Sequence, residues 1–404
     1  MREPSYDFSV AHADGRFVLR DAGGLVPEMR EYLQAYLRKI SGYRPVGLFR
    51  GEPLLSLYQA PPGSRAGIRS LKMRLRRRFT GARIPATATL AVNRACQCAC
   101  EHCSAYHYNH SRKPELSAAE WREAIAQTVG LGVTQLIFLG GEPLLRGDLG
   151  NLLASVPSDR ACSIIFTNGE YMREGRAESL WERGLMGAFV SLDAARPEEH
   201  DRLRGRPGLF EKAIAGILHW RRSGAMVGIS SYLSPQRLET GVFEEMMELG
   251  RDLGVNEVTF FDAIPSGVWL HREESLLRPS DRRQIRVLVE HYRKKAGYPG
   301  ISAQSLLTSA EGGAFCFAAN TQFYLGAGGE MCPCDFTPLS VGRFPEENLE
   351  ALWLRMTTSP PYNCRAKACR MQDLEFRRQW IDTIPSSASL PWLLRRGEGT
   401  GGLD

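Results

Sequence analysis

The chain has 404 residues, of which 43% are hydrophobic and 24% charged, and its formal net charge at pH 7 is +6. This size gives room for about two or three globular domains. No stretch reaches the roughly 18 apolar residues of a membrane span, and the N-terminal sequence MREPSYDFSV lacks the apolar region of a secretory signal. The composition therefore excludes a membrane-embedded protein, predicts a cytoplasmic one, and does not by itself indicate a nucleic-acid partner.

Residues 1–86 are predicted to form an N-terminal accessory domain of mixed α and β structure. In chain order the patterns predict a strand, a helix, a hairpin and a second helix, at 14–21, 26–40, 45–62 and 65–79. A strand followed by helices could bind a peptide by strand addition. A structural cap over the rest of the protein is the alternative.

The second of these helices is strongly basic. Its apolar face is formed by Ile68, Leu71, Leu75 and Phe79. The residues around that face are Arg69, Lys72, Arg74, Arg76, Arg77 and Arg78. A solvated charged face is one interpretation, and contact with an anionic membrane surface that delivers a lipid substrate is another. RNA phosphates are a third, but the segment lacks interleaved aromatic residues, so we expect no nucleic acid.

From residue 87 to residue 298, apolar β-rich runs alternate with helical patterns. The runs lie at 87–93, 133–139, 162–168, 187–193, 226–232 and 257–262. Nearly continuous apolar runs are typical of strands buried on both faces of a parallel sheet, and Ser117 with Glu120 has the pattern of a helix capping box. Six units are too few for a closed eight-stranded barrel. We therefore expect an α/β fold with a partial (β/α)6 barrel.

The chain contains ten cysteines, and five of them lie in the Gly-rich, irregular sequence of residues 299–375. In a reducing cytosol they are better explained as metal ligands, catalytic thiols or small buried hydrophobic residues than as disulfides. Cys162, at the start of the third run, is expected to pack in the core. We predict a separate domain at 299–375 and a C-terminal tail at 376–404, of which the last ten residues have the composition of a disordered segment.

Four cysteines crowd the loop that follows the first run. Cys96, Cys100 and Cys103 have the spacing C-x3-C-x2-C, and a loop of this length can bring three thiolates to three irons of a [4Fe–4S] cluster. The fourth iron then has no protein ligand, so a small molecule can bind there. Cys98 has an offset that should point it away from the other three, and we interpret it as a spare thiol. A zinc site that adds His102 to the three cysteines is the alternative.

With this loop the sequence resembles the radical S-adenosylmethionine (radical SAM) superfamily, whose CxxxCxxC motif the three cysteines match. The residue before the last cysteine is usually aromatic in that family, and here it is His102, whose imidazole can stack on adenine. The resemblance covers residues 87–295. It implies that SAM binds the open iron, that a reduced cluster cleaves it to methionine and a 5′-deoxyadenosyl radical, and that this radical abstracts hydrogen from a substrate.

The ends of the next three strands match the superfamily as well. The sequence GGEP provides Gly140, Gly141 and Glu142. Glycines expose backbone at a strand end, and the resemblance implies that the Glu142 carboxylate accepts hydrogen bonds from the ammonium group of SAM. The resemblance implies further cofactor contacts at Thr167, Asn168, Ser191, Asp193 and Arg204. Ser191 would contact the ribose or the carboxylate of SAM. Arg204 would pair with that carboxylate, and the alternative for it is a surface arginine.

The C-terminal cysteines resemble the auxiliary-cluster domains known as SPASM and Twitch. Cys316, Gly329 and Cys334 fit the opening C-x(9–15)-G-x4-C, and Cys364 and Cys369 would complete the ligands of one auxiliary [4Fe–4S] cluster. A full seven-cysteine SPASM pattern is absent, so the shorter Twitch-like form is expected. Cys332 competes with Cys334 as a ligand, and the glycine spacing favours Cys334.

A proton acceptor is also needed if the substrate is oxidised. Asp262, at the end of the sixth strand, and Asp335, beside Cys334, are the candidates. A capping or solvated carboxylate is the alternative for each.

The resemblance thus predicts an enzyme that oxidises or cross-links a peptide or a small natural product, with the auxiliary cluster as electron acceptor and flavodoxin or ferredoxin as electron donor. Two alternatives remain. One is a radical SAM enzyme that acts on a lipid at the membrane surface. The other is a non-catalytic iron–sulfur or zinc protein.

Overall fold

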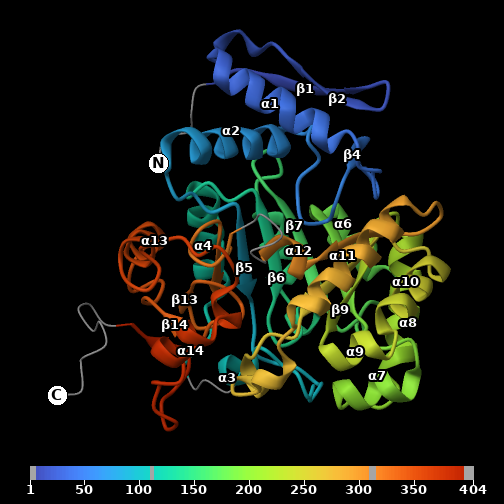
Figure 1. Ribbon diagram of the computed structural model, residues 1–404, viewed down its shortest axis with the longest axis vertical. Coiled ribbons are helices and arrows are strands. Elements are labelled where there is room, and N and C mark those ends of the chain that lie inside the picture. Colours follow the sequence, from blue (N-terminus) through green and yellow to red (C-terminus); the bar gives the residue numbers. More distant parts are fainter. Residues whose placement is uncertain (1–5, 110–112, 309–314, 395–404) are drawn as a thin grey trace.

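A nine-stranded sheet forms the centre of the protein (Figure 1). The computed structural model describes residues 6–109, 113–308 and 315–394. Six strands lie parallel and in chain order: β5 (Thr87–Ala91), β6 (Gln135–Leu139), β7 (Cys162–Thr167), β8 (Leu185–Ser191), β9 (Met226–Leu233) and β10 (Glu257–Asp262). They occupy nearly the same residues as the six predicted runs, so the partial (β/α)6 barrel is confirmed.

Helices between these strands cover the outer face of the barrel. They are α4 (Ala118–Gly130), α5 (Leu149–Ala154), α6 (Arg176–Glu182), α7 (Pro197–Arg204), α8 (Leu209–Arg222), α9 (Pro235–Glu239), α10 (Val242–Asp252) and α11 (Pro279–Lys294). Helix α4 begins with the predicted capping box, in which Ser117 and Glu120 satisfy each other's backbone N–H groups. The core between helices and sheet is mainly apolar. In it, Phe243 of α10 stacks on Phe260 of β10 with ring centroids 4.4 Å apart. Cys162 is buried in this sheet, as expected.

The sheet does not stop at the predicted domain boundary after residue 298. Strand β11 (Gly300–Ala303) pairs parallel with β10, and β12 (Gln322–Leu325) pairs parallel with β5. Strand β13 (Met331–Cys332) adds antiparallel to β12. The cysteine-rich C-terminal segment is therefore joined by backbone hydrogen bonds to the first strand of the barrel.

The remaining C-terminal elements lie beside β5 (Figure 1). They are β14 (Leu339–Ser340), α13 (Leu349–Thr358), α14 (Leu374–Trp380) and β15 (Trp392–Leu393), whereas α12 (Gln304–Thr308) follows β11 at the other edge of the sheet and packs on β10 and α11. Strand β15 pairs parallel with β14, and Arg377 and Ile381 are fully buried. Most of the predicted tail therefore packs on the protein, and the ten residues expected to be disordered lie outside the described residues.

The N-terminal elements stand at the opposite end of the molecule from the loop that follows β5 (Figure 1). They are the hairpin β1 (Ser9–Ala13) and β2 (Arg16–Arg20), α1 (Pro27–Ile40), the hairpin β3 (Gly47–Phe49) and β4 (Glu52–Leu54), and α2 (Arg65–Thr80). This arrangement agrees with the predicted mixed domain and adds strand β1. Leu33 and Leu37 of α1 pack with Leu71 and Leu75 of α2 in a small core of their own.

The basic charge of α2 is partly structural. Arg69 is only 5% exposed, and its guanidinium donates hydrogen bonds to the carbonyls of Val129, Val133 and Arg160 on the barrel. The interpretation of Arg69 as part of a solvated or membrane-facing surface is therefore wrong, because its charge ties α2 to the barrel. Within the described ranges, none of the helices combines the length and apolar character that crossing a membrane requires.

Candidate active site

A cavity of about 1650 Å³ lies inside the barrel and is lined both by the loops that follow the strands and by Tyr58, Arg74 and Arg77 of the N-terminal domain. Several aromatic side chains line it, among them Tyr58, Phe166, Tyr232, Phe261, Trp269 and Phe336. Small-molecule pockets usually measure about 300–1,000 Å³. The cavity therefore has room for two molecules side by side.

The cysteine loop after β5 is held in place by three backbone hydrogen bonds. Gly141 N donates to Asn93 O at 3.0 Å, Glu142 N to Ala95 O at 2.7 Å, and Ala99 N to Arg204 O at 3.0 Å. A Cβ atom on Gly141 would lie 2.4 Å from Ala95 O. The second glycine of GGEP is thus needed because the cysteine loop passes directly against it.

Four thiols of this loop face the cavity, including Cys98. The prediction that Cys98 points away is wrong, because its thiol makes hydrogen-bond contacts with both Cys96 and Cys100. The Cys98 contact, together with the nearby Arg204, lowers the pKa of Cys100 to about 5. Cys103 belongs to the same group. The loop turns back on itself tightly enough to bring the intervening cysteine to the same side.

His102 does not join these thiols. Its Nε2 lies 3.2 Å from Asp193 Oδ2, and its ring packs on Tyr232 with centroids 4.4 Å apart. In the described part of the chain, no three His, Cys, Asp or Glu side chains converge on a point where one ion could sit. A zinc ion needs such convergence, with ligands about 2.0–2.3 Å away, whereas a cubane receives each thiolate on a different iron. The arrangement fits a cluster better than the zinc alternative.

Glu142 is buried behind the cavity wall and binds protein donors. Its carboxylate accepts hydrogen bonds from Thr167 Oγ1 at 2.7 Å, Asn168 N at 2.8 Å and Leu144 N at 2.9 Å. Burial raises the pKa of this carboxyl despite these donors. The contacts tie the GGEP loop to the end of β7, so Glu142 orders the edge of the site; its role toward an ammonium group stays a prediction.

Asp193 and Arg204 form a buried ion pair beneath the cysteine loop. Arg204 Nε lies 2.5 Å from Asp193 Oδ2. Burial alone would raise the pKa of Asp193, but Arg204 and His102 outweigh it and hold that pKa well below its usual range. Arg204 Nη1 also points to Cys100 Sγ at 3.8 Å. Arg204 is therefore not a surface arginine.

Two hydroxyl groups lie beside this pair on neighbouring strands. Ser191 Oγ at the end of β8 and Ser230 Oγ on β9 are 3.3 Å apart, and both line the cavity. Thr167, Asn168 and Gly140 line it as well. The predicted cofactor contacts thus come together at one edge, with Glu142 behind them.

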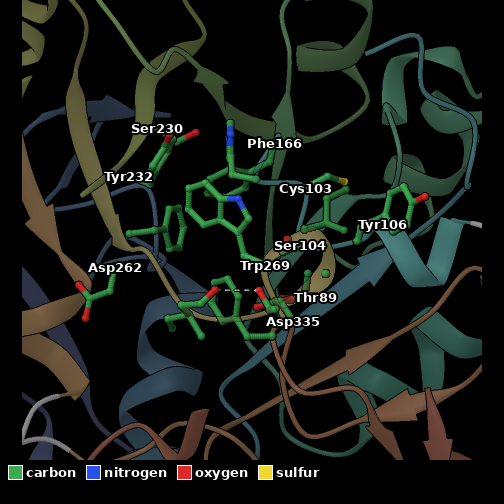
Figure 2. Close-up of a pocket in the computed structure, with 18 of the residues that line it drawn as sticks. Thr89, Cys103, Ser104, Tyr106, Phe166, Ser230, Tyr232, Asp262, Trp269 and Asp335 are labelled. Carbon is green, nitrogen blue, oxygen red and sulfur yellow. Dashed lines mark hydrogen bonds between the residues drawn. The ribbon is translucent and has the colours of Figure 1, made fainter. Parts of the chain in front are cut away.

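The two candidate proton acceptors, Asp262 and Asp335, differ in their hydrogen-bond partners. Asp262 accepts hydrogen bonds from Ser305 and from Gln372 Nε2, so both of its oxygens have protein partners. Asp335 accepts one hydrogen bond, from Gln322 Nε2 at 2.7 Å, and its Oδ1 has no partner in the described residues. Thr89 lies beside it (Figure 2). Burial raises the pKa of Asp335 to about 6, which makes it the better candidate for a proton acceptor.

The C-terminal cysteines form a second group behind the wall of the cavity. Cys316 and Cys369 share a hydrogen bond. Cys334 lies near both, because Cys316 helps burial to raise the pKa of Cys334, and Cys334 contributes to the raised pKa of Cys369. Cys332 is on the other side of the chain, packed with Tyr108 and Tyr324. This geometry agrees with the preference for Cys334.

Cys364 differs from these three thiols because it is exposed. Its Sγ lies 3.4 Å from Arg370 Nη2 and 3.8 Å from Pro361 O. Its role as a ligand stays a prediction.

Trp269 and Tyr232 were not singled out from the sequence. Figure 2 shows the Trp269 indole in the middle of the view, between Tyr232 and Cys103. His102 Nδ1 and Trp269 Nε1 are buried without a hydrogen-bond partner in the described residues, although both residues line the cavity. Buried polar atoms are normally paired, so these two fit a cavity that takes a polar, aromatic molecule such as SAM.

The comparisons with known proteins agree with this geometry. Residues 90–235 match the Radical SAM superfamily. AdoMet-dependent heme synthase of Methanosarcina barkeri is 26% identical over 64% of this chain and 79% of its own length. PqqA peptide cyclase of Rhizobium meliloti is 31% identical over 50% of this chain and 53% of its own length.

Among solved structures, Streptococcus suis SuiB bound to precursor peptide SuiA has the same fold. It covers 90% of this chain and 89% of SuiB, with a TM-score of 0.58 and 16% identity. The open parallel barrel of this chain has the fold of that structure. The similarity of the chain to the Radical SAM superfamily therefore covers residues 90–235, which include the cysteine loop.

Proposed function

We propose that the enzyme oxidises or cross-links a peptide or a related natural product, with an auxiliary iron–sulfur cluster as electron acceptor. The observation that carries the proposal is the position of the second thiol group. Cys334 is followed directly by Asp335 and Phe336, which line the cavity. When bound, the first cluster and SAM supply a radical that takes hydrogen from the substrate, and the second cluster takes the electron left behind.

The side chains of this protein have three tasks in such a reaction. The first is to hold SAM, and we assign it to Cys96, Cys100 and Cys103 as cluster ligands and to the edge formed by Ser191 and Arg204. The second is to keep water out, which suits the aromatic walls of the cavity. The third is to remove a proton from the oxidised substrate.

Asp335 is suited to that third task. Its pKa of about 6 leaves it ionised at neutral pH, yet high enough to hold a proton once transferred. Its free Oδ1 lies in a wall shared by the cavity and the second thiol group. Proton and electron would thus leave the substrate on the same side.

The size of the cavity and the relatives support a peptide substrate. SuiB is solved with a precursor peptide, and PqqA peptide cyclase acts on a peptide by its name. The hairpin of β1 and β2 is a separate two-stranded sheet in the described residues, so an extended peptide can add to its edge. We therefore propose the N-terminal domain as the place where such a peptide docks.

The alternative of a lipid substrate at a membrane has less support. Of the arginines in α2, Arg69 is buried against the barrel, and Arg77 donates to Ile84 O at 3.2 Å. Arg74 stacks on the ring of Tyr36, 4.2 Å from its centroid. The basic face is therefore largely engaged within the protein.

Anaerobic reconstitution followed by reduction with dithionite or reduced flavodoxin tests the proposal. With SAM present, we expect 5′-deoxyadenosine to be released, and we expect about eight irons and eight sulfides per chain, as two cubanes require. A count of about four would remove the auxiliary cluster. A protein that binds iron or zinc without cleaving SAM would be a scaffold instead.

A further inference from the structure

We infer that Cys98 is a reversible fourth thiolate ligand of the cluster, bound to the open iron while SAM is absent and displaced when SAM binds. The inference rests on the proposed cluster at Cys96, Cys100 and Cys103. It gives a function to a cysteine that the family motif leaves over.

The position of the Cys98 side chain is the first support. Cys98 lines the cavity together with the three motif cysteines, and it makes hydrogen-bond contacts with two of them, Cys96 and Cys100. A thiol in contact with two ligands of a cluster is within reach of that cluster. An offset that turned it outward, toward solvent, would have kept it out of reach.

The surroundings of Cys98 also direct it into the site. Asn168 Nδ2 lies 3.6 Å from Cys98 Sγ, within hydrogen-bond distance for sulfur, so this amide helps to hold the sulfur at the wall of the cavity. Gln97 Nε2 orients that amide by donating to Asn168 Oδ1 at 3.2 Å and to Glu170 Oε2 at 2.7 Å. Asn168 itself is fixed through its backbone N–H to Glu142.

The backbone next to Cys98 is equally constrained. Ala99 N donates to Arg204 O, and a Cβ atom on Gly205 would lie 2.6 Å from Ala99 O. The loop therefore rests against the end of α7 on one side and against GGEP on the other. Cys98 occupies a defined place rather than the tip of a free loop.

The exchange is a ligand substitution without a redox change. The Cys98 thiol gives up its proton to solvent when its sulfur binds iron. When the amine and carboxylate of SAM bind that iron, the iron–sulfur bond breaks and the thiolate takes a proton back. An iron without a protein ligand is the one most easily lost from a cubane, so Cys98 should protect the cluster of the SAM-free enzyme.

The test compares the wild-type protein with Cys98→Ala and Cys98→Ser, each reconstituted anaerobically. Cys162→Ala, a cysteine buried in the sheet, is the matched control. After brief exposure to air without SAM, electron paramagnetic resonance measures the [3Fe–4S] fraction formed by loss of one iron. We expect this fraction to be several-fold larger in both Cys98 variants than in the wild type and the control, and equal in all four proteins when SAM is present.

Mössbauer spectra of the wild type supply a readout that needs no variant. We expect all irons to have sulfur-rich coordination without SAM and one to change when SAM is added. Equal [3Fe–4S] fractions in wild type and variants without SAM would overturn the inference. So would a disulfide from Cys98 to Cys96 or Cys100 that forms in air whether or not SAM is present. Absence of iron from the loop in the wild type would instead refute the proposed function.

Discussion

Arg204 Nε lies 2.5 Å from Asp193 Oδ2, and the carboxylate is 1% exposed beneath the cysteine loop. Arg204 also points to Cys100 and accepts the backbone N–H of Ala99 at its carbonyl. One ion pair therefore supports both the end of α7 and the position of Cys100, which we propose as a cluster ligand.

Replacing Asp193 with Asn should leave the Arg204 charge buried without a counter-charge. Removing one partner of a buried ion pair lowers the free energy of unfolding by about 3–5 kcal/mol. We expect urea denaturation to show a decrease of this size for Asp193→Asn. The control is Glu199→Gln, which removes an exposed pair with Arg196 and should cost less than about 1 kcal/mol. Because the pKa of Asp193 is held below its usual range, its contribution is present above its unfolded pKa and lost only as the pH falls through the folded one. The difference in free energy of unfolding between the wild type and Asp193→Asn should thus persist from pH 9 to pH 5.

Replacing Asp335 should stabilise the folded protein, whereas replacing Asp193 should destabilise it. Its pKa rises from 3.8 to about 6 on folding, so ionising it in the folded protein costs about 3 kcal/mol more than in the unfolded chain. This cost is absent below the unfolded pKa and complete above about pH 6. Asp335→Asn should therefore raise the melting temperature at pH 8 and leave it nearly unchanged at pH 4. An unchanged melting temperature at pH 8 would contradict the raised pKa.

The activity of the same variant tests the proposed proton acceptor. Substrate oxidation by the wild type should fall as the pH drops below about 6, because Asp335 becomes protonated. Asp335→Asn should lose most of the oxidised product while it still cleaves SAM. Asp262→Asn is the comparison, and because both oxygens of Asp262 have protein partners, we expect it to lower stability instead.

The choice between Cys332 and Cys334 can be decided by metal analysis. Cys334 lies with Cys316 and Cys369, whereas Cys332 packs among tyrosine rings. Cys334→Ala should reduce the iron content from about eight to about four per chain, and Cys332→Ala should leave it unchanged. The reverse result would transfer the ligand role to Cys332.

Arg69 should be far more important for folding than the exposed arginines of α2. Hydrogen bonds from a charged donor contribute about 1.5–3 kcal/mol each, and Arg69 makes three, all to barrel carbonyls. We expect Arg69→Ala to lower the free energy of unfolding by several kcal/mol. Arg78→Ala on the exposed face should change it by less than about 0.5 kcal/mol. Equal effects would mean that the clamp between α2 and the barrel does not form.

The barrel could be predicted because its strands are buried on both faces and separated by helices with clear caps. Which strands lie next to each other depends on contacts between residues far apart in the chain, so it cannot be predicted from each segment alone. Strand β12 has only four residues and lies next to a Gly-rich turn, so nothing in residues 322–325 reveals that they pair with residues 87–90. Strands β11 and β13 are also short, at four and two residues, and the sequence does not predict them.

Site residues that belong to a sequence motif could be predicted, whereas those positioned only by tertiary contacts could not. Cys96, Cys100 and the glycines of GGEP could be named from spacing. The orientation of Cys98 depends on a loop held by α7, and the segment that carries Trp269 is tied to the cysteine loop by a hydrogen bond from Val268 N to Cys103 O at 3.1 Å. Neither contact leaves a trace in the sequence near those residues.

The pairing of β12 with β5 also has a consequence for biosynthesis. Until residue 325 has left the ribosome, the strand that leads into the first cofactor loop has an open side, and unpaired strand edges attract other chains. In the nascent barrel this edge of β5 stays unpaired until more than half of the polypeptide has been synthesised after it. Chaperones or prompt translation of the last hundred residues would then determine how much enzyme escapes aggregation.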